Sequence, residues 1–146
     1  MELAKSGFDV AIHYNASAGA AAEVVASCLA VGAHAFAVQG DLVSAAGCRA
    51  VASSVGERWS GLNLLVNNAS LFVPRPFEDI DDAAWAEMLN VNLTAPFRLA
   101  RNLLGQLRAG DEAAVGAPAG QHSLVVHLCD IGAQRPLLGY THYSVS

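Results

Sequence analysis

Short apolar runs rich in β-branched residues alternate along this chain with longer helix-forming segments. We expect strands over residues 8–14, 33–39, 62–66 and 124–130. Strands separated by segments of helical length are typical of right-handed βαβ units, in which consecutive strands run parallel. The alternation therefore predicts an α/β fold with a doubly wound parallel sheet, in which the strand at 124–130 is buried.

The segments between these strands carry the usual signals for helix starts and stops. Gly7 and Gly32 are expected to end helices, and Ser44 is expected to cap one. We expect helices over residues 1–6, 18–31, 45–59 and 81–108, and a surface excursion over 109–123.

The composition favours a buried core and argues against several classes of partner. Hydrophobic residues make up 53% of the chain and charged residues 14%, which is typical of a well-packed α/β domain. The net charge of −5 argues against nucleic acid or an anionic membrane as a partner. The uncharged run 24–40 is only 17 residues long and contains Gly32 and His34, so it predicts no membrane span.

The cysteines and histidines indicate neither disulfides nor a metal site. Cys28, Cys48 and Cys129 lie far apart in apolar segments, as expected of reduced core thiols in a cytosolic protein. The five histidines lack the spacing of metal ligands. No charged-then-apolar leader opens the sequence. We therefore expect a cytoplasmic protein without a metal.

The last predicted strand ends in an acid, and a tyrosine follows it. Residues 124–129 are largely apolar, and the polarity changes abruptly at Asp130. A loop with glycine and proline then leads to a helix start near Tyr143. These residues would place a carboxyl group and a phenol together at the carboxyl edge of the sheet. Open α/β sheets bind their ligands at that edge.

The residues around this tyrosine resemble a known family, the short-chain dehydrogenases/reductases. Tyr143-Ser144-Val145-Ser146 is similar to the Tyr-x-x-x of that family's Tyr-x-x-x-Lys motif, ending one residue before the lysine. Most members have a serine thirteen residues before the tyrosine, and here that residue is Asp130. An aspartate there, together with Gln134 and residues 136–140, resembles the pteridine reductase branch.

The resemblance implies a nicotinamide cofactor, and the segment His13-Tyr14-Asn15-Ala16-Ser17 bears on which one. It lacks the acidic residue that binds the ribose of NAD. Asn15 and Ser17 can donate to a phosphate, and pteridine reductases have a similar His-Tyr-x-x-Ser segment, usually with an arginine at the position of Ala16. We therefore expect NADPH, held by His13, Asn15 and Ser17, with a plain helix cap at Ser17 as the alternative.

Two later loops match further cofactor contacts of the family. The resemblance implies that Asp41 accepts a hydrogen bond from adenine, with Leu42 beside it, although Gly-Asp after a strand is also a common turn. Asn67-Asn68-Ala69-Ser70 follows the third strand, and Asn-Asn-Ala-Ser is the form seen in pteridine reductases. Asn68, Ala69 and Ser70 are therefore expected beside the cofactor.

An aromatic residue near this motif is the expected substrate contact. Phe72 aligns with the ring that stacks a pterin against the nicotinamide, and simple loop packing is the alternative. Tyr140, Leu137 and Leu138 are expected to wall the same pocket.

The long predicted helix carries one polar residue on its apolar face. That face consists of Trp85, Met88, Asn92, Leu99 and Leu103. Pro96 has no N–H, so the carbonyl of Asn92 loses its helical donor, at a cost of about 3 kcal/mol. The resemblance assigns the matching asparagine a water in a proton relay, and a simple kink is the alternative.

Asp130 and Tyr143 are the expected catalytic pair. A free phenol has a pKa of about 10, and in the family a lysine four residues later and the nicotinamide ribose assist it. An ionised Asp130 would repel a developing oxyanion, so it opposes carbonyl reduction. It suits a substrate with N–H groups and a C=N bond, such as a pteridine. Capping of the following turn is the alternative for Asp130.

The resemblance also indicates which part of the fold this sequence lacks. The family's domain begins with a strand, a Gly-x-x-x-Gly-x-Gly turn and a helix. No such motif occurs here, and residues 1–6 match the last turn of that helix. We therefore expect residues 1–146 to be a partial dinucleotide-binding domain from a longer protein. The missing strand is central, so the first two strands should lie across a gap from the last two. We expect the isolated fragment neither to fold natively nor to catalyse a reaction.

Three functions are compatible with these residues. The favoured one is an NADPH-dependent reductase of a pteridine of the dihydrobiopterin, dihydrofolate or dihydromonapterin type. The second is a generic carbonyl or 3-oxoacyl reductase. The third is a non-catalytic truncated product that acts only through its long helix as an oligomerisation surface. Relatives are commonly tetramers, so a homo-oligomer is expected at full length.

Overall fold

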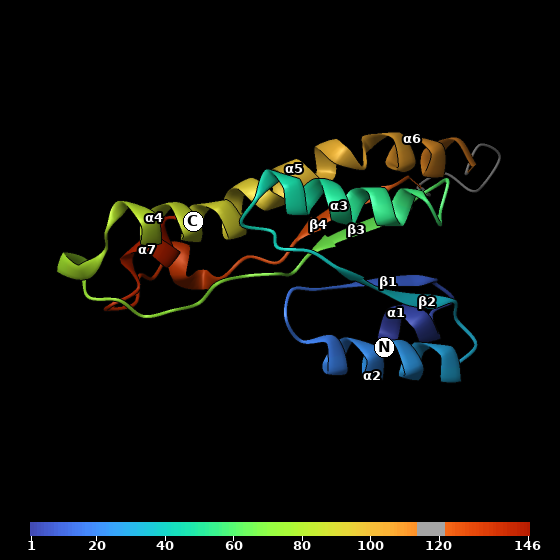
Figure 1. Ribbon diagram of the computed structural model, residues 1–146, viewed down its shortest axis with the longest axis horizontal. Helices are drawn as coiled ribbons and strands as arrows, with labels where there is room; N and C mark the ends of the chain where they lie inside the picture. Colours follow the sequence, from blue (N-terminus) through green and yellow to red (C-terminus); the bar gives the residue numbers. More distant parts are fainter. Residues whose placement is uncertain (114–121) are drawn as a thin grey trace.

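The computed structural model describes residues 1–113 and 122–146, and its strands and helices alternate along the chain (Figure 1). The first half contains α1 (Glu2–Lys5), β1 (Val10–Tyr14), α2 (Ala18–Ala30), β2 (Ala35–Gln39), α3 (Ala45–Gly56) and β3 (Leu64–Asn67). The second half contains η1 (Phe77–Asp79), α4 (Asp82–Leu89), the π-helical turn η2 (Asn90–Thr94), α5 (Ala95–Asn102), α6 (Leu104–Ala113), β4 (Leu124–His127), η3 (Ile131–Ala133) and α7 (Thr141–Ser144). Most of the predicted surface excursion lies outside the described residues.

The strands form two separate parallel pairs. In the first pair β1 runs beside β2, and Val10 lies opposite Ala35. In the second pair β3 runs beside β4, and Leu64 lies opposite Leu124. Within the part of the chain that the structure describes, no strand joins the two pairs. The predicted parallel α/β architecture is confirmed, and so is the predicted gap between the first and second pairs of strands.

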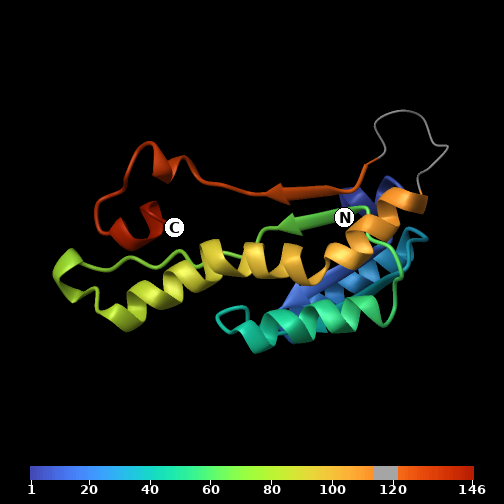
Figure 2. The same ribbon diagram turned by 90° about the horizontal axis from the view of Figure 1, so that it is seen from above.

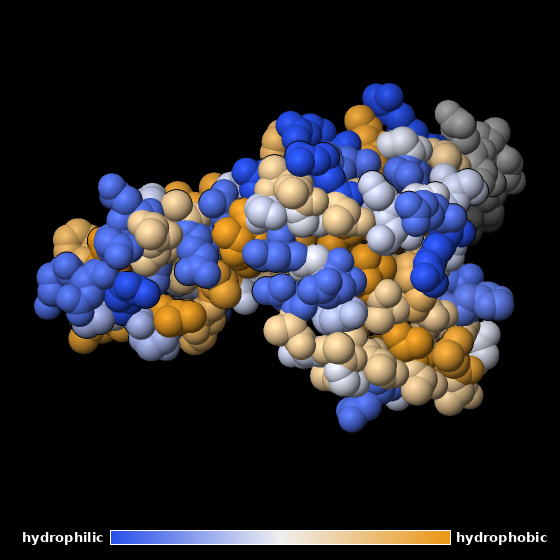
Figure 3. Space-filling model, viewed as in Figure 1, coloured by the Kyte–Doolittle hydropathy of each residue, from blue (hydrophilic) through white to orange (hydrophobic). Residues whose placement is uncertain are grey.

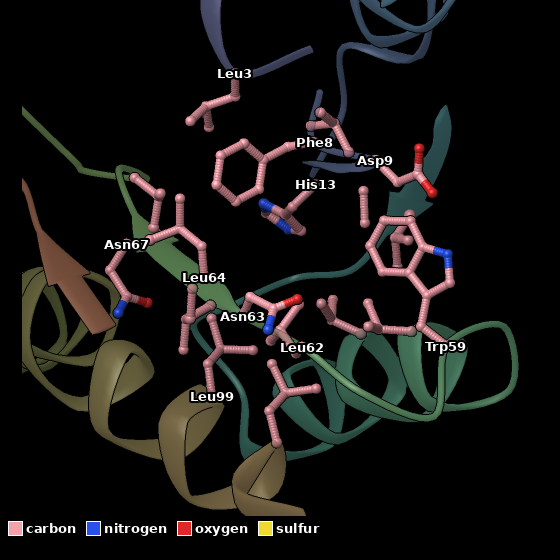
Figure 4. A pocket seen from close by; sticks show the side chains of 18 of the residues that line it. Leu3, Phe8, Asp9, His13, Trp59, Leu62, Asn63, Leu64, Asn67 and Leu99 are labelled. Carbon is pink, nitrogen blue, oxygen red and sulfur yellow. The ribbon is translucent and has the colours of Figure 1, made fainter. Parts of the chain in front are cut away.

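A cavity of about 910 Å³ occupies this gap. Figure 4 shows side chains of both halves pointing into it, including Phe8 and His13 on one side and Leu64 and Leu99 on the other. Figure 3 shows apolar atoms in the hollow where the two parts of the molecule meet. The cavity is therefore an apolar space between β1 and β3, where the sequence lacks the expected central strand.

The main core lies where α3 packs against α5, and Leu107 of α6 also belongs to it. Its buried residues are Val38, Leu42, Cys48, Val51, Ala52, Val55, Ala95, Leu99, Leu103 and Leu107. Each fully buried Val or Leu contributes about 1.5–3 kcal/mol. Trp59 packs edge-on against Phe36 at the margin of this core, with ring centroids 4.8 Å apart. The core therefore fixes α3, from the first half of the chain, against α5 in the second half.

Most of the predicted helix ends lie close to the observed ones. Ser44 caps α3, and its Oγ accepts a hydrogen bond from the Gly47 N–H at 2.9 Å. Gly7 and Gly32 follow α1 and α2 with φ values of 89° and 88°, a conformation that glycine adopts at little cost. The end of α3 comes earlier than predicted, at Gly56.

The helix predicted over residues 81–108 is interrupted, which corrects the sequence analysis. A π-helical turn separates α4 from α5, and in it the Ala95 N–H donates to the Asn90 carbonyl. Pro96 has no N–H to offer the carbonyl four residues earlier, and a wider turn is one way in which a helix accommodates that loss. The helical path is broken again at Leu103, and α6 then continues to Ala113.

The predicted burial of the last strand is wrong. Leu124 is 59% exposed and Val126 39% exposed. β4 pairs with β3 alone, and its principal contacts are with that strand (Figure 2). An apolar run therefore predicted the strand correctly but not its environment. Cys129 likewise is exposed, whereas Cys28 and Cys48 are buried as predicted.

Two further properties concern the described residues only. None of the helices in residues 1–113 and 122–146 has the length and apolar character needed to cross a bilayer. The same residues contain no cluster of three or more histidine, cysteine or acidic side chains arranged to bind a metal ion.

Close packing at Gly47 generates a stability prediction. A Cβ at this position would overlap the Asp41 carbonyl oxygen, whereas a Cβ at Gly105 would meet no atom within 4 Å. Gly47→Ala should therefore destabilise the full protein by about 1–3 kcal/mol. The matched variant Gly105→Ala should be neutral or more stable by up to about 1 kcal/mol, because alanine is the better helix former. Urea unfolding measures both, and equal stabilities of the two variants would contradict the observed packing.

Candidate active site

Polar residues gather where the parallel strands end. Asn15 follows β1, Asp41 follows β2, Asn67 ends β3, and Asp130 lies three residues after β4. Since paired parallel strands end at the same edge, each pair carries its polar residues on one side. The candidate site therefore has two parts, one on each pair of strands.

Asp130 and Tyr143 lie on either side of Gly132. A Cβ built on Gly132 would be 3.3 Å from Asp130 Oδ1 and 3.5 Å from Tyr143 Cε1. The Gly132 N–H also donates to Asp130 Oδ1 at 2.6 Å, so Asp130 caps η3. Asp130 thus caps the following turn, which was the alternative interpretation of this residue. The same hydrogen bond holds its carboxylate beside the Tyr143 ring.

The surroundings of Tyr143 raise the pKa of its phenol above the ordinary value. Partial burial is the largest cause, followed by a hydrogen bond with Asp130 and its negative charge, while the Ser70 hydroxyl acts in the opposite direction. Burial and a neighbouring carboxylate both disfavour a phenolate. Tyr143 is therefore held in its protonated form, the form that can donate a proton.

Two aromatic rings, those of Phe72 and Tyr140, lie beside this phenol. Phe72 stacks on Tyr140 with centroids 4.3 Å apart and an interplanar angle of 18°. Phe72 also meets Tyr143 edge to face at 4.7 Å and 75°. To admit a third ring between them, the Phe72 and Tyr140 rings would have to be separated by about 7 Å, which is twice the contact distance of two carbon atoms. Their separation is therefore too small for a ligand ring. Any ligand that stacks on Phe72 must therefore use the ring face that Tyr140 does not cover.

A backbone contact joins the loops that carry these rings. The Arg75 N–H donates to the Gly139 carbonyl at 2.7 Å. Gly139 has a φ of 78°, and this turn delivers Tyr140 to the stack. Leu137 is half exposed and Leu138 fully exposed, so these two predicted pocket residues face solvent in this structure.

Asn92 lies in the π-helical turn and binds the loop before Phe72. Its Oδ1 accepts the Leu71 N–H at 2.8 Å, and its Nδ2 donates to the Leu71 carbonyl at 3.1 Å. Nδ2 also lies 2.9 Å from Ser146 Oγ and 3.2 Å from Met88 Sδ. The sequence singled out the backbone carbonyl of Asn92, whereas the structure shows the side chain making the contacts. The proton-relay role of the carbonyl stays a prediction.

The predicted phosphate-binding residues follow β1. His13 Nε2 lies 2.8 Å from the Gly40 carbonyl oxygen, which ties the ends of β1 and β2 together. The Asn15 carbonyl accepts a hydrogen bond from Gln39 Nε2 at 3.2 Å, and the Asn15 residue is exposed. Ser17 precedes α2 and is exposed, and its hydroxyl makes no capping hydrogen bond. Asn15 and Ser17 are therefore open to a ligand.

The predicted adenine-binding residues make local contacts. Asp41 Oδ1 accepts the Val43 N–H at 3.0 Å, so its carboxylate stabilises the turn that was the alternative interpretation. Leu42 is only 5% exposed and belongs to the core, where it also borders the cavity.

The residues of the Asn-Asn-Ala-Ser segment have different surroundings. Asn67 is 8% exposed, and its Nδ2 lies 3.4 Å from His127 Nδ1, which links β3 to β4. Asn68 and Ala69 border the cavity between the strand pairs. Ser70 lies near Tyr143, since its hydroxyl lowers the pKa of that phenol.

The structure thus brings Asp130, Tyr143, Ser70, Phe72 and Tyr140 into one cluster, to which Asn92 is tied through Leu71. The residues predicted to bind the cofactor phosphate lie on the other strand pair, at the ends of β1 and β2. Ser146, which contacts Asn92, was not predicted from the sequence as a residue of the site. Its position three residues after Tyr143, one helical turn on, was the available signal.

Parallel strand pairs with helical crossovers and polar carboxyl ends define the class of this protein, a Rossmann-like dinucleotide-binding fold. The sequence model of the short chain dehydrogenase family matches residues 1–146. The chain therefore belongs to the short-chain dehydrogenase/reductase family.

Similar proteins include reductases and complexes with nicotinamide cofactors. The chain is 31% identical over 110 residues to hydroxynaphthalene reductase arp2 of Aspergillus fumigatus, covering 75% of this chain and 40% of that protein. It is 31% identical to a short chain dehydrogenase of Burkholderia cenocepacia solved with NADP, with a TM-score of 0.85 over 99% of this chain and 54% of that one. It is 25% identical to NADH-dependent reductase A1-R' complexed with NAD, with a TM-score of 0.87 over 99% and 58%. The chain therefore spans about half the length of these solved relatives.

The neighbours of Tyr143 generate a prediction about its ionisation. Asp130→Asn removes a negative charge from beside the phenol and should lower the pKa of Tyr143. Ser70→Ala removes a hydroxyl that favours the phenolate and should raise that pKa. Tyrosinate absorbance during a pH titration measures both shifts, with Tyr143→Phe as the baseline for the other two tyrosines. A titration curve unchanged in Asp130→Asn would show that the carboxylate does not act on the phenol.

Proposed function

We propose that the full protein is an NADPH-dependent reductase that transfers hydride to a pteridine. The observation that carries this proposal is the carboxylate of Asp130 beside the phenol of Tyr143. In most of the family a serine hydroxyl stands at this position and donates to a carbonyl oxygen. A carboxylate instead accepts hydrogen bonds, so it suits a heterocycle that presents N–H groups.

The residues after β1 fit the phosphate of NADPH. The exposed Ser17 residue precedes α2, and its hydroxyl makes no capping hydrogen bond. Asn15 is exposed beside it, and no acidic residue occurs between His13 and Ser17 to repel a phosphate. The bound cofactor would supply the hydride, and the protein would bind, orient and protonate the substrate.

Each residue of the cluster has a part in this proposal. Tyr143 would donate its phenolic proton to a ring nitrogen, because a phenol is protonated at neutral pH and the surroundings of Tyr143 further disfavour the phenolate. Asp130 would accept an N–H of the substrate and fix the orientation of its ring. Phe72 would offer the ring face that Tyr140 leaves uncovered.

A generic carbonyl reductase, including a 3-oxoacyl reductase, is the second candidate. The relative from Aspergillus fumigatus is a hydroxynaphthalene reductase, which favours this alternative at the level of the family. The negative charge of Asp130 argues against it, because charge of the same sign develops on a carbonyl oxygen during reduction. A cytoplasmic homo-oligomer, such as a tetramer, is the state proposed for the full protein.

Exchanging the carboxylate for the family's serine tests the choice of substrate. NADPH oxidation by the full protein is measured with dihydrobiopterin, dihydrofolate and a simple β-keto ester. Asp130→Ser should lower pteridine turnover at least about tenfold, the usual cost of losing a charged hydrogen bond, and it should raise turnover of the ester. Asp79→Ser, a change at an exposed acid of η1, should alter neither. Undiminished pteridine turnover in Asp130→Ser without a gain for the ester would show that Asp130 does not select the substrate.

The segment after β1 generates a prediction about the cofactor. Ala16 is exposed between Asn15 and Ser17, where a guanidinium could pair with a phosphate. Ala16→Arg should tighten NADPH binding about tenfold relative to NADH, the effect of one charged phosphate contact. Fluorescence titration with the two cofactors measures the ratio. Ala26→Arg, an equal change at an exposed position further along α2, should leave it unchanged. A ratio that rises equally in both variants would show that the segment does not meet the phosphate.

A further inference from the structure

We propose that Ser146 is a positioning residue. It couples Asn92 to α7, the helix that carries Tyr143, and so holds the phenol ring in contact with Phe72. The catalytic part of this inference rests on the proposed reductase function. Its structural part does not, because it concerns contacts within the protein.

The hydroxyl of Ser146 bridges two groups. Its Oγ donates to the Tyr143 carbonyl oxygen at 2.8 Å and lies 2.9 Å from Asn92 Nδ2. A serine hydroxyl has one proton and two lone pairs, so it can donate to the carbonyl and accept from the amide at once. The serine can therefore hold both contacts at once, while the two hydrogens of Asn92 Nδ2 are shared among Ser146 Oγ, the Leu71 carbonyl and Met88 Sδ.

The other end of Asn92 fixes the loop that carries Phe72. Its side-chain amide makes a reciprocal pair of hydrogen bonds with the N–H and carbonyl of Leu71, at 2.8 and 3.1 Å. Phe72 is the next residue, and its ring contacts the Tyr143 ring at 4.7 Å. A chain of contacts thus runs from Phe72 through Leu71, Asn92 and Ser146 to Tyr143. The contact between the Phe72 and Tyr143 rings joins its two ends.

The helix that carries Tyr143 needs such an attachment. Among the described residues, α7 buries two polar atoms that have no hydrogen-bond partner, His142 Nδ1 and Ser144 Oγ. Unpaired buried groups favour a shift of the helix toward water. The bridge through Ser146 opposes that shift and is attached to a turn of the long helical segment.

The test compares two serines of the same segment in the full protein. Ser146→Ala breaks the bridge, whereas Ser144→Ala removes a hydroxyl without a partner. Ser146→Ala should lower kcat for pteridine reduction about tenfold with KM within about twofold, because misplacement of a reacting group acts on the chemical step. Ser144→Ala should leave both constants unchanged, and Ser146→Thr, which keeps a hydroxyl, should restore most of the rate. Equal effects of the two alanine variants would overturn the proposal.

A double-mutant cycle tests whether Asn92 acts through Ser146. Asn92→Ala should lower kcat about a hundredfold, because it releases Leu71 as well as Ser146. The double variant should be no slower than Asn92→Ala alone, since the bridge is already broken. Losses that multiply to about a thousandfold would show two independent roles and refute the coupling.

A titration without substrate separates this inference from the proposed function. Release of α7 should expose the Tyr143 phenol and move its pKa down toward the ordinary value, because burial is the main cause of the present shift. Tyrosinate absorbance should show this change in Ser146→Ala and not in Ser144→Ala. If the shift occurs while no pteridine is reduced, the positioning role stands and the pteridine proposal fails. If pteridine is reduced and the titrations of the two variants are identical, the positioning role fails.

Discussion

Pro96 has no N–H, and this one missing hydrogen-bond donor determines how the helix is built next to the residues that surround Tyr143. The carbonyl of Asn92 cannot be paired as in an ordinary α-helix, and the chain passes through a π-helical turn before α5 begins. The turn holds Asn92 where its amide reaches Leu71 on one side and Ser146 on the other. An irregular turn in one helix thus anchors both the loop before Phe72 and the segment that contains α7. π-Helical turns are frequent at functional sites.

The two parts of the candidate site have different mechanical support. The residues after β1 and β2 are joined by the contact of His13 with the Gly40 carbonyl, and the turn at Asp41 packs tightly against Gly47 of α3. The tyrosine cluster lies away from the main core, and contacts among its own rings and loops hold it together. The part at the ends of β1 and β2 therefore rests on close backbone packing, whereas the part that contains Asp130 and Tyr143 depends on a few directional contacts.

Local sequence signals predicted much of this arrangement. Each predicted strand overlaps the observed one with its end moved by a few residues, and the missing central strand predicted the separation of β1 from β3. The proximity of Asp130 and Tyr143 was expected from a strand followed by a helix at the same edge. The π-helical turn was not predicted, because Pro96 signals lost pairing but not how the helix restores it. The stacking of Phe72 on Tyr140 joins residues 68 positions apart, which no local pattern encodes.

β4 has a consequence for how the molecule behaves in solution. Its residues are apolar or neutral, they contain no proline, and they form the uncovered edge of a two-stranded pair. Edges of this kind accept further extended segments from other molecules, and proteins commonly block them with charges or covering elements. Residues 124–128 contain no lysine, arginine, aspartate or glutamate. In a chain of residues 1–146 alone, self-association through this edge would therefore increase with protein concentration, and an added lysine on the strand would oppose it.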